Sequence, residues 1–191
     1  MDGLLIGRFQ PFHLGHLDAV LFGLSRTENL FICIGSSNKS NESRNPFSAK
    51  ERREMITSSI DPAMSDRIKI FDIPDVGDHE KWTFEIDKTV PKYDVVFTND
   101  EFTETLFKKH GMNVIPVVLK DREKFSGTNI RELIAGDKNW QDLVPDGTKK
   151  AVSERLFSKA IERRTGSGNH SSSGTTAAGL PRKSSEANAS T

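Results

Sequence analysis

The sequence is poor in cysteine and has no long apolar run. Its single cysteine, Cys33, cannot form an internal disulfide, and it lies in the apolar run Leu30–Ile34 with no polar group beside it to activate a thiolate. A buried structural thiol is therefore expected rather than a nucleophile. No stretch approaches the ~18 apolar residues that span a membrane, and the first residues lack a signal-peptide pattern. These absences predict a cytoplasmic protein with no membrane partner.

An excess of charge of either sign is also missing. The chain of 191 residues has 27 Lys and Arg against 27 Asp and Glu, which gives a formal net charge of +0. There is no global electrostatic case for binding DNA or RNA. We therefore expect no nucleic-acid partner, and any positive site must be local.

The length predicts one domain, or one domain with a tail. From residue 165 onward Gly, Ser, Thr, Asn and Ala dominate, and Leu180 is the only large apolar residue. Such a segment cannot bury enough surface to offset the entropy lost on ordering. We predict a folded domain over residues 1–164 and a disordered tail over residues 165–191.

Short apolar runs alternate with amphipathic segments through the predicted domain. The runs, at 3–6, 30–34, 67–73, 94–98 and 112–119, are typical of buried parallel strands. The segments between and after them predict helices whose buried faces include Leu21, Phe102, Leu156 and Ile161. This alternation predicts an α/β parallel sheet with right-handed crossovers. The expected arrangement is Rossmann-like, with five strands in the order 3-2-1-4-5, flanking helices and a helical C-terminal end. Pro116 places the fifth strand at an edge or a bulge.

The first strand is followed by Gly7–His16, which reads Gly-Arg-Phe-Gln-Pro-Phe-His-Leu-Gly-His. A helix start offers free N–H groups and the positive end of a dipole, which suit phosphate. Gly15 has no side chain to block a ligand, and His13 and His16 can donate hydrogen bonds and carry partial positive charge near neutral pH. They could also be metal ligands, but no third ligand follows at a recurring spacing, so we expect no protein-bound metal.

A second constellation follows the fifth strand, at Ser126–Arg131 (Ser-Gly-Thr-Asn-Ile-Arg). Thr128 and Arg131 are three residues apart and share one face of the first turns of a helix. The hydroxyl, the guanidinium and the free backbone donors of the helix start would point at one anion. On its own, this pattern would also fit an ordinary helix cap with a solvated arginine.

Together the two motifs resemble the H-x-G-H and S-[ST]-T-x-x-R signatures of the nucleotidylyltransferase superfamily. The form of Gly7–His16 is similar to that of archaeal-type nicotinamide-mononucleotide adenylyltransferases. Related segments are Ile34-Gly35-Ser36, Asn45-Pro46-Phe47, Glu51-Arg52, Ile73-Pro74 with Trp82, and Asp142–Pro145. Arg8 and Gln10 point away from the pantetheine-phosphate and glycerol-phosphate relatives, which tend to carry Gly-Thr-Phe-Asp in the first motif.

The resemblance implies residue roles. It places Arg8, His13, His16, Arg44 and Arg131 in the catalytic set, with His16 near the ATP α-phosphate and Arg44 on a flexible loop that could close over the nucleotides. ATP binding is implied for Gly7, Arg8, Phe9, His13, Gly15, His16, Ser126, Gly127, Thr128 and Arg131. Binding of nicotinamide mononucleotide (NMN) is implied for Asp75, His79 and Trp82, with Trp82 stacked on the nicotinamide ring.

Two positions depart from the family pattern. Asn99-Asp100 follows the fourth strand where the family commonly has Gly-Asn, and His79 stands where the family tends to have Asn. Asn can adopt the left-handed conformation that Gly supplies, so the turn is expected to survive. The added carboxylate and the changed amide-reading position have no explanation in the sequence.

The implied reaction is adenylyl transfer from ATP to NMN, which gives NAD and pyrophosphate. The implied cofactor is Mg²⁺, held mainly by the ATP phosphates, because the sequence offers no evident carboxylate cage. Two alternatives stay open: another acceptor (nicotinic acid mononucleotide or pantetheine phosphate), or a nucleotide-binding sensor without catalysis on the same fold. The family resemblance also implies a homo-oligomer.

Overall fold

The computed structural model describes residues 1–118 and 121–166, except for the side chains of residues 79 and 163–166. The chain divides into two units, Met1–Leu156 and Phe157–Thr191. Most of the tail predicted over residues 165–191 lies outside the described residues. None of the described helices is long and apolar enough to cross a membrane.

Five parallel strands form one sheet in the order β3-β2-β1-β4-β5. They are β1 (Asp2–Gly7), β2 (Asn29–Ile34), β3 (Ile68–Asp72), β4 (Val95–Thr98) and β5 (Asn113–Pro116). The predicted sheet and strand order are confirmed. β5 lies at an edge and ends at Pro116, as expected of a residue that cannot donate to the ladder.

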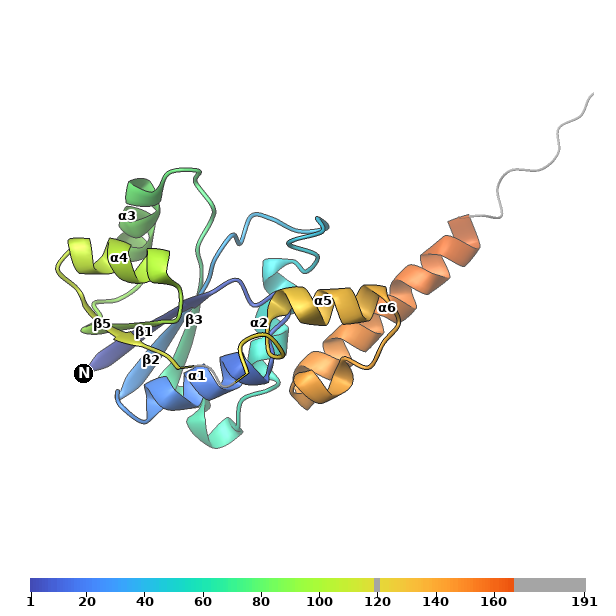
Figure 1. Cartoon of the computed structure of the whole chain (residues 1–191), viewed down its shortest axis with the longest axis horizontal. Coiled ribbons are helices and arrows are strands. Elements are labelled where there is room, and N and C mark those ends of the chain that lie inside the picture. Colours follow the sequence, from blue (N-terminus) through green and yellow to red (C-terminus); the bar gives the residue numbers. More distant parts are fainter. Residues whose placement is uncertain (119–120, 167–191) are drawn as a thin grey trace, which may run out of the picture. The chain divides into compact units, whose positions relative to one another are not determined.

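Helices cover both faces of the sheet (Figure 1). They are α1 (Leu14–Leu24), α2 (Ala49–Thr57), α3 (His79–Thr89), α4 (Glu101–Lys109), α5 (Gly127–Ala135) and α6 (Asp146–Gly166), with short 3-10 helices at Pro62–Arg67 and Gln141–Leu143. One core cluster joins side chains of α1, α2, α5 and the start of α6 to one face. The other joins α3 and α4 to the opposite face. The layers follow because each strand is apolar on both sides.

Side-chain caps begin the helices that follow the strands. Ser48 and Glu51 form a reciprocal capping box at the start of α2. Asp78 caps α3, and Ser126 caps α5. Each of these caps is predicted by the local sequence, because Ser and Asp oxygens accept from the free N–H groups of a helix start.

The predicted burial of four apolar residues is wrong. Leu21, Phe102, Leu156 and Ile161 are all exposed by more than 40%. In α1 the predicted residues Val20 and Leu24 are buried, together with Ala19 and Gly23. A Cβ on Gly23 would lie 2.9 Å from Leu30 Cδ1, so the helix packs closely on the sheet along this face and Leu21 lies beside it, toward solvent.

Candidate active site

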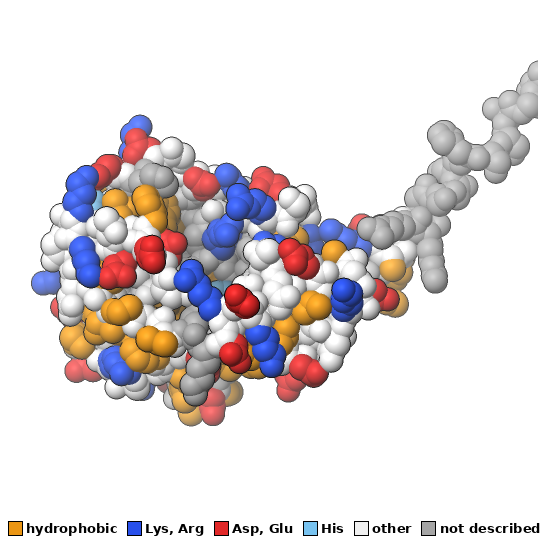
Figure 2. Space-filling view, in the orientation of Figure 1, with side chains coloured by type: hydrophobic (Ala, Val, Ile, Leu, Met, Phe, Trp, Pro, Cys, Tyr) orange, Lys and Arg blue, Asp and Glu red, His pale blue; other side chains and the backbone are white. Residues whose placement is uncertain are grey.

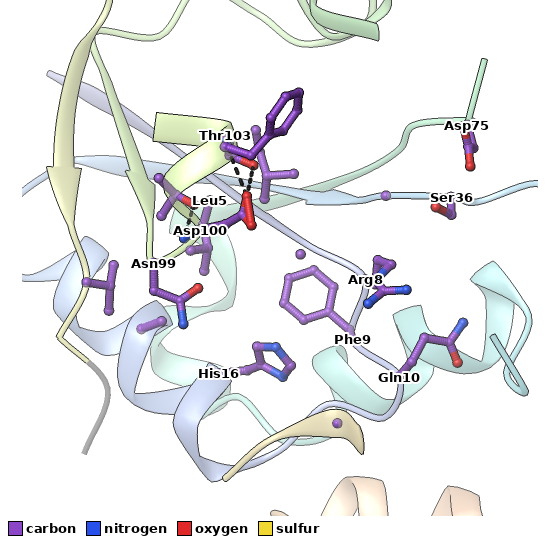
Figure 3. Close-up of a pocket in the computed structure, with 18 of the residues that line it drawn as sticks. Leu5, Arg8, Phe9, Gln10, His16, Ser36, Asp75, Asn99, Asp100 and Thr103 are labelled. Atoms are coloured by element: carbon purple, nitrogen blue, oxygen red, sulfur yellow. Dashed lines mark hydrogen bonds between the residues drawn. The ribbon is translucent and has the colours of Figure 1, made fainter. Parts of the chain in front are cut away.

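A cavity of about 610 Å³ lies at the carboxyl edge of the sheet. Residues of the segments that follow all five strands line it, as is usual where the strand order reverses in an open parallel sheet. Figure 2 shows Lys and Arg side chains beside a hollow in the surface. Figure 3 shows Arg8, Phe9, His16, Asn99 and Asp100 around the common space.

The two histidines hold each other at the start of α1. His13 is the N-cap, and its Nδ1 accepts from the backbone N–H of His16 at 3.3 Å. The Nδ1 of His16 accepts in turn from the backbone N–H of His13 at 3.3 Å. The rings stack with centroids 3.6 Å apart. Because both Nδ1 atoms are acceptors, each neutral ring carries its proton on Nε2, which is left to donate to a ligand.

Both histidines are neutral at pH 7 in the free protein. Burial lowers the pKa of His13 to about 4, and His13 is only 3% exposed. Burial, and then the charge of His13, hold the pKa of His16 well below its usual value. The expected partial positive charge is therefore not present before a ligand binds. The pair offers N–H donors, and the positive charge at the site comes from arginines.

Phe9 forms an aromatic wall beside the histidines. Its ring meets His16 edge-on, with centroids 4.8 Å apart, and its backbone φ is +52°. Phe9 is 1% exposed, so it belongs to the core as well as to the cavity lining. In Figure 3 its ring lies between His16 and Arg8. The His16 ring is thus packed against both Phe9 and the His13 ring.

Helix α5 brings the second motif against the first. Arg131 donates from Nη1 to the Gln10 carbonyl oxygen at 2.8 Å and from Nη2 to Thr128 Oγ1 at 3.2 Å. A Cβ on Gly127 would lie 2.9 Å from the same carbonyl oxygen, so the approach requires glycine. The histidine turn and the start of α5, more than 100 residues apart in sequence, thus lie side by side in the wall of the cavity.

Positive charge converges at this wall. Arg8, Arg122 and Arg131 all line the cavity. Burial lowers the pKa of Arg131, and the nearby charges of Arg8 and Arg44 lower it further. Such mutual repulsion between cations is relieved when a polyanion binds, which makes the wall suited to a triphosphate.

The lining of the cavity also includes Asp75 and Trp82. The Asp75 carboxylate pairs with Lys39 at 2.8 Å, and this hydrogen bond and charge raise the pKa of Lys39. Trp82 is in the first turn of α3 and packs edge-on against Phe107. The side chain of His79 lies outside the described part of the chain.

Side-chain amides form hydrogen bonds between neighbouring loops at this edge of the sheet. The buried Gln10 amide donates to the Phe47 carbonyl at 2.8 Å and accepts from the Phe47 N–H at 3.0 Å. Asn38 pairs in the same way with the backbone of Asp75. The Gln10 side chain is therefore structural, and any selectivity it carries is indirect.

Arg52 is a buried cation beneath the site. It is 0% exposed and donates to the carbonyl oxygens of Arg8 and Gly35, both at 2.8 Å, and of Ser36 at 3.0 Å. Burial lowers its pKa to about 10, so it stays charged at neutral pH. It holds the ends of β1 and β2 together and adds positive potential under the cavity.

The carboxylate of Asp100 has a structural explanation. It caps α4, where it accepts from Thr103 N at 3.0 Å and Thr103 Oγ1 at 3.2 Å (Figure 3). Asp is among the preferred N-cap residues, and a negative charge is favourable at this end of a helix. The departure at this position therefore serves α4, although Asp100 also lines the cavity.

Most residues implied by the resemblance line the cavity: Gly7, Arg8, Phe9, His13, His16, Asp75, Trp82, Gly127, Thr128 and Arg131. Gly15, Ser126 and Arg44 are not in the described lining. A Cβ on Gly15 would lie 3.2 Å from His13 Nδ1, so this glycine makes room for the histidine ring. The local motifs do not indicate functional roles for Arg122 and Arg52. Arg122 stands four residues before Ser126, which is the one signal that could have found it.

No group of three or more His, Cys, Asp and Glu side chains suited to a metal ion is found in the part of the chain that the structure describes. The donor set at the cavity consists of cations, imidazole N–H groups and scattered carboxylates. A divalent ion fits here when substrate oxygens complete its coordination.

Known proteins resemble this chain in both sequence and fold. A family model described as cytidylyltransferase-like matches residues 4–133. The nicotinamide-nucleotide adenylyltransferase of Saccharolobus solfataricus is 40% identical over 154 residues, 80% of this chain and 90% of that protein. The chain belongs to the nicotinamide-nucleotide adenylyltransferase family. The enzyme of the same name from Thermococcus sibiricus is 35% identical over 165 residues, 85% of this chain and 87% of that protein.

Solved structures share the fold. A bifunctional NMN adenylyltransferase/ADP ribose pyrophosphatase from Francisella tularensis, complexed with AMP and a Mn ion, gives a TM-score of 0.60 at 18% identity. It covers 88% of this chain, which spans 56% of that longer chain. A second structure of that protein gives 0.65 at 20% identity, with 88% and 57% covered. At this identity the likeness supports the fold alone.

Proposed function

We propose that the protein is an adenylyltransferase that joins ATP and NMN to give NAD and pyrophosphate. The observation that carries the proposal is the meeting of the histidine turn and the start of α5 at one cavity, through the Arg131–Gln10 hydrogen bond. Membership of the nicotinamide-nucleotide adenylyltransferase family supports it.

The reaction is an in-line displacement at the α-phosphorus of ATP. An oxygen of the NMN 5′-phosphate forms the new P–O bond, the bond to the β-phosphate oxygen breaks, and pyrophosphate leaves with the electron pair. The nucleophile is already ionised at neutral pH, so no general base is needed. Catalysis then consists of positioning and charge stabilisation.

In the proposed mechanism, the neutral histidines donate hydrogen bonds and the arginines supply positive charge. The Nε2–H groups of His13 and His16 donate to phosphate oxygens, with His16 near the α-phosphate. Arg8, Arg44 and Arg131 balance the charge that develops on the triphosphate. The neutral histidines suit this role, because a desolvated N–H donor aimed at developing charge costs little reorganisation in the transition state.

Mg²⁺ is the proposed metal, held mainly through the phosphates of ATP. When bound, it neutralises charge on the leaving pyrophosphate. The proposed partner of the nicotinamide ring is Trp82, which lines the cavity as Asp75 does, and the family resemblance implies that Asp75 and residue 79 take part in binding NMN. The Ser126 cap and Gly127 hold the start of α5 where its free N–H groups reach the β- and γ-phosphates.

A coupled assay tests the proposal. Purified protein with ATP, Mg²⁺ and NMN should release pyrophosphate and form NAD in equal amounts. Nicotinic acid mononucleotide and pantetheine phosphate, each supplied in place of NMN, test the alternative acceptors. Binding of NAD without pyrophosphate release would refute catalysis and favour a sensor.

We also infer a cytoplasmic location, from the composition of the sequence, and a homo-oligomer, which the family resemblance implies. Light scattering coupled to size-exclusion chromatography tests the assembly. A monomer at micromolar concentration would overturn this part of the proposal and leave the assay of activity unaffected.

A further inference from the structure

The loop that carries Arg44 is a narrow hairpin. The backbones of Glu42 and Asn45 exchange N–H···O bonds of 3.2 and 3.1 Å, which places Ser43 and Arg44 at the tip. At the base, the Asn41 N–H donates to the Pro46 carbonyl at 3.3 Å. The four residues 41–44 are exposed, so the hairpin itself buries little that would hold Arg44 in place.

A single guanidinium on α6 closes the base of this hairpin. Arg155 donates from Nη2 to Asn41 Oδ1 at 2.8 Å and to the Pro46 carbonyl at 2.6 Å, so it bridges both limbs. Its Nη1 pairs with Glu51, the residue that completes the capping box of α2. The Arg155 side chain is 15% exposed, and it lies 5.3 Å from the centroid of the Phe47 ring.

The hairpin is linked to the cavity wall through the residue that follows it and through the charge at its tip. Phe47, directly after the clamped residue Pro46, is paired with the Gln10 amide in the histidine turn. The charge of Arg44 is felt by Arg131 on α5. The base of the hairpin is thus held from α6 and, through Phe47, from the histidine turn, and the Arg44 charge at its tip lies close enough to Arg131 to lower the pKa of that guanidinium.

We propose that Arg155 is a positioning residue that holds the Arg44 hairpin over the phosphates of the bound nucleotides. Arg155 does not line the cavity in the described part of the chain, so it acts through the hairpin. An arginine is needed because its planar fork reaches three acceptors at once, which the single ammonium of a lysine does not match. This inference rests on the proposed function only for its kinetic test.

The kinetic test is a double-mutant cycle. R155A is expected to lower kcat/KM by on the order of tenfold, because a misplaced charge loses much of its effect on the transition state. In an R44A background, the same change should lower kcat/KM by less than about twofold, since no guanidinium is left to position. K150A, which removes a positive charge from an exposed position of the same helix, is the matched control and should behave as wild type.

Hydrogen exchange tests the clamp without any activity. In the ligand-free protein, R155A and R155K should speed exchange of the Asn41, Glu42 and Asn45 amides, while K150A should not. If the wild-type protein makes no NAD but these amides respond, the proposed function fails and the clamp stands.

Two results would overturn the clamp. One is an unchanged rate of hydrogen exchange at the hairpin amides in R155A, when thermal unfolding shows that this variant is folded. The other is a loss of kcat/KM from R155A that is as large in the R44A background as in wild type, which would mean a general structural effect.

Discussion

At the scale of single residues, the histidine pair shows how backbone bonds set side-chain chemistry. Each Nδ1 accepts a backbone N–H of the other histidine, so protonation of either ring would break a hydrogen bond as well as bury a charge. The pair is therefore an uncharged donor site placed among arginines. This assignment leads to two predictions.

The first concerns catalysis. H16A is expected to lower kcat by at least about 10²-fold, the loss seen when one preorganised donor to the transition state is removed. Steady-state rates of pyrophosphate release, with thermal unfolding as the check on folding, measure this. A kcat close to wild type would remove His16 from the α-phosphate site.

The second concerns stability and pH. The pKa of His13 falls from 6.5 in the unfolded chain to about 4 in the folded protein. Between these values the unfolded state binds a proton that the folded state does not, so stability falls as the pH drops from 6.5 toward 4. From pH 7 to pH 5 the loss due to His13 is about 2 kcal/mol.

H13N tests this, because Asn keeps an N-cap acceptor and does not titrate. Urea unfolding at pH 7 and pH 5 should show a smaller loss of stability in H13N than in wild type. Equal losses in the two proteins would contradict the low pKa of His13.

Single residues also mark where prediction from sequence stops. Arg8, His13, His16 and Arg131 could be placed at the site because local motifs carry them. The roles of Gln10 and Arg52 could not, because their partners are 37 and up to 44 residues away along the chain. The cap formed by Asp100 follows a local rule, since Asp before a helix is a common N-cap.

At the scale of elements, the start of α5 depends on a glycine with little space around it. A Cβ on Gly127 would lie 2.9 Å from the Gln10 carbonyl oxygen and 3.1 Å from Arg131 Nη1. G127A must push α5 away from the histidine turn and break the Arg131–Gln10 bond. We expect KM for ATP to rise by about tenfold, because phosphate donors at a helix start act over short distances.

G136A is the control at the other end of the same helix. Gly136 has an ordinary φ of −88°, and the nearest atom to an added Cβ is a carbonyl oxygen of α5 itself, at 3.3 Å. Its KM for ATP should stay within about twofold of wild type, since a moderate local strain there does not reach the cavity. A normal KM for ATP in G127A would contradict the close approach.

Elements differ in how well local patterns predict them. The five strands and the caps at Ser48, Asp78 and Ser126 follow from short sequence patterns, because apolar runs and cap residues act locally. In α1 the spacing correctly predicts Val20 and Leu24 as buried but is wrong for Leu21. Spacing counts Leu21 as a core residue, but the close approach at Gly23 rotates the helix and leaves Leu21 42% exposed.

At the scale of the whole molecule, alternation of strands and helices predicts a parallel sheet with right-handed crossovers, so a cavity at the carboxyl ends of the strands could be predicted. What sequence could not give is how the loops are held. Gln10 with Phe47, Asn38 with Asp75, and Arg155 with Pro46 each join segments that only the folded chain brings together. These bonds join the loops that follow β1, β2 and β3 to one another, and join α6 to the loop after β2.

The distribution of these contacts along the chain leads to a prediction about truncation. In the described part of the chain, the last residue lining the cavity is Arg131, and the clamp residue Arg155 precedes the end of α6. A chain that ends at Arg164 should therefore keep the kcat and both KM values of the full protein within about twofold, as expected when no contact with the site is removed. Parallel initial-rate measurements on the two proteins check this. A loss of more than about fivefold in kcat/KM, with unchanged thermal unfolding, would assign a role in the reaction to residues 165–191, because such a loss exceeds what fraying at a helix end causes.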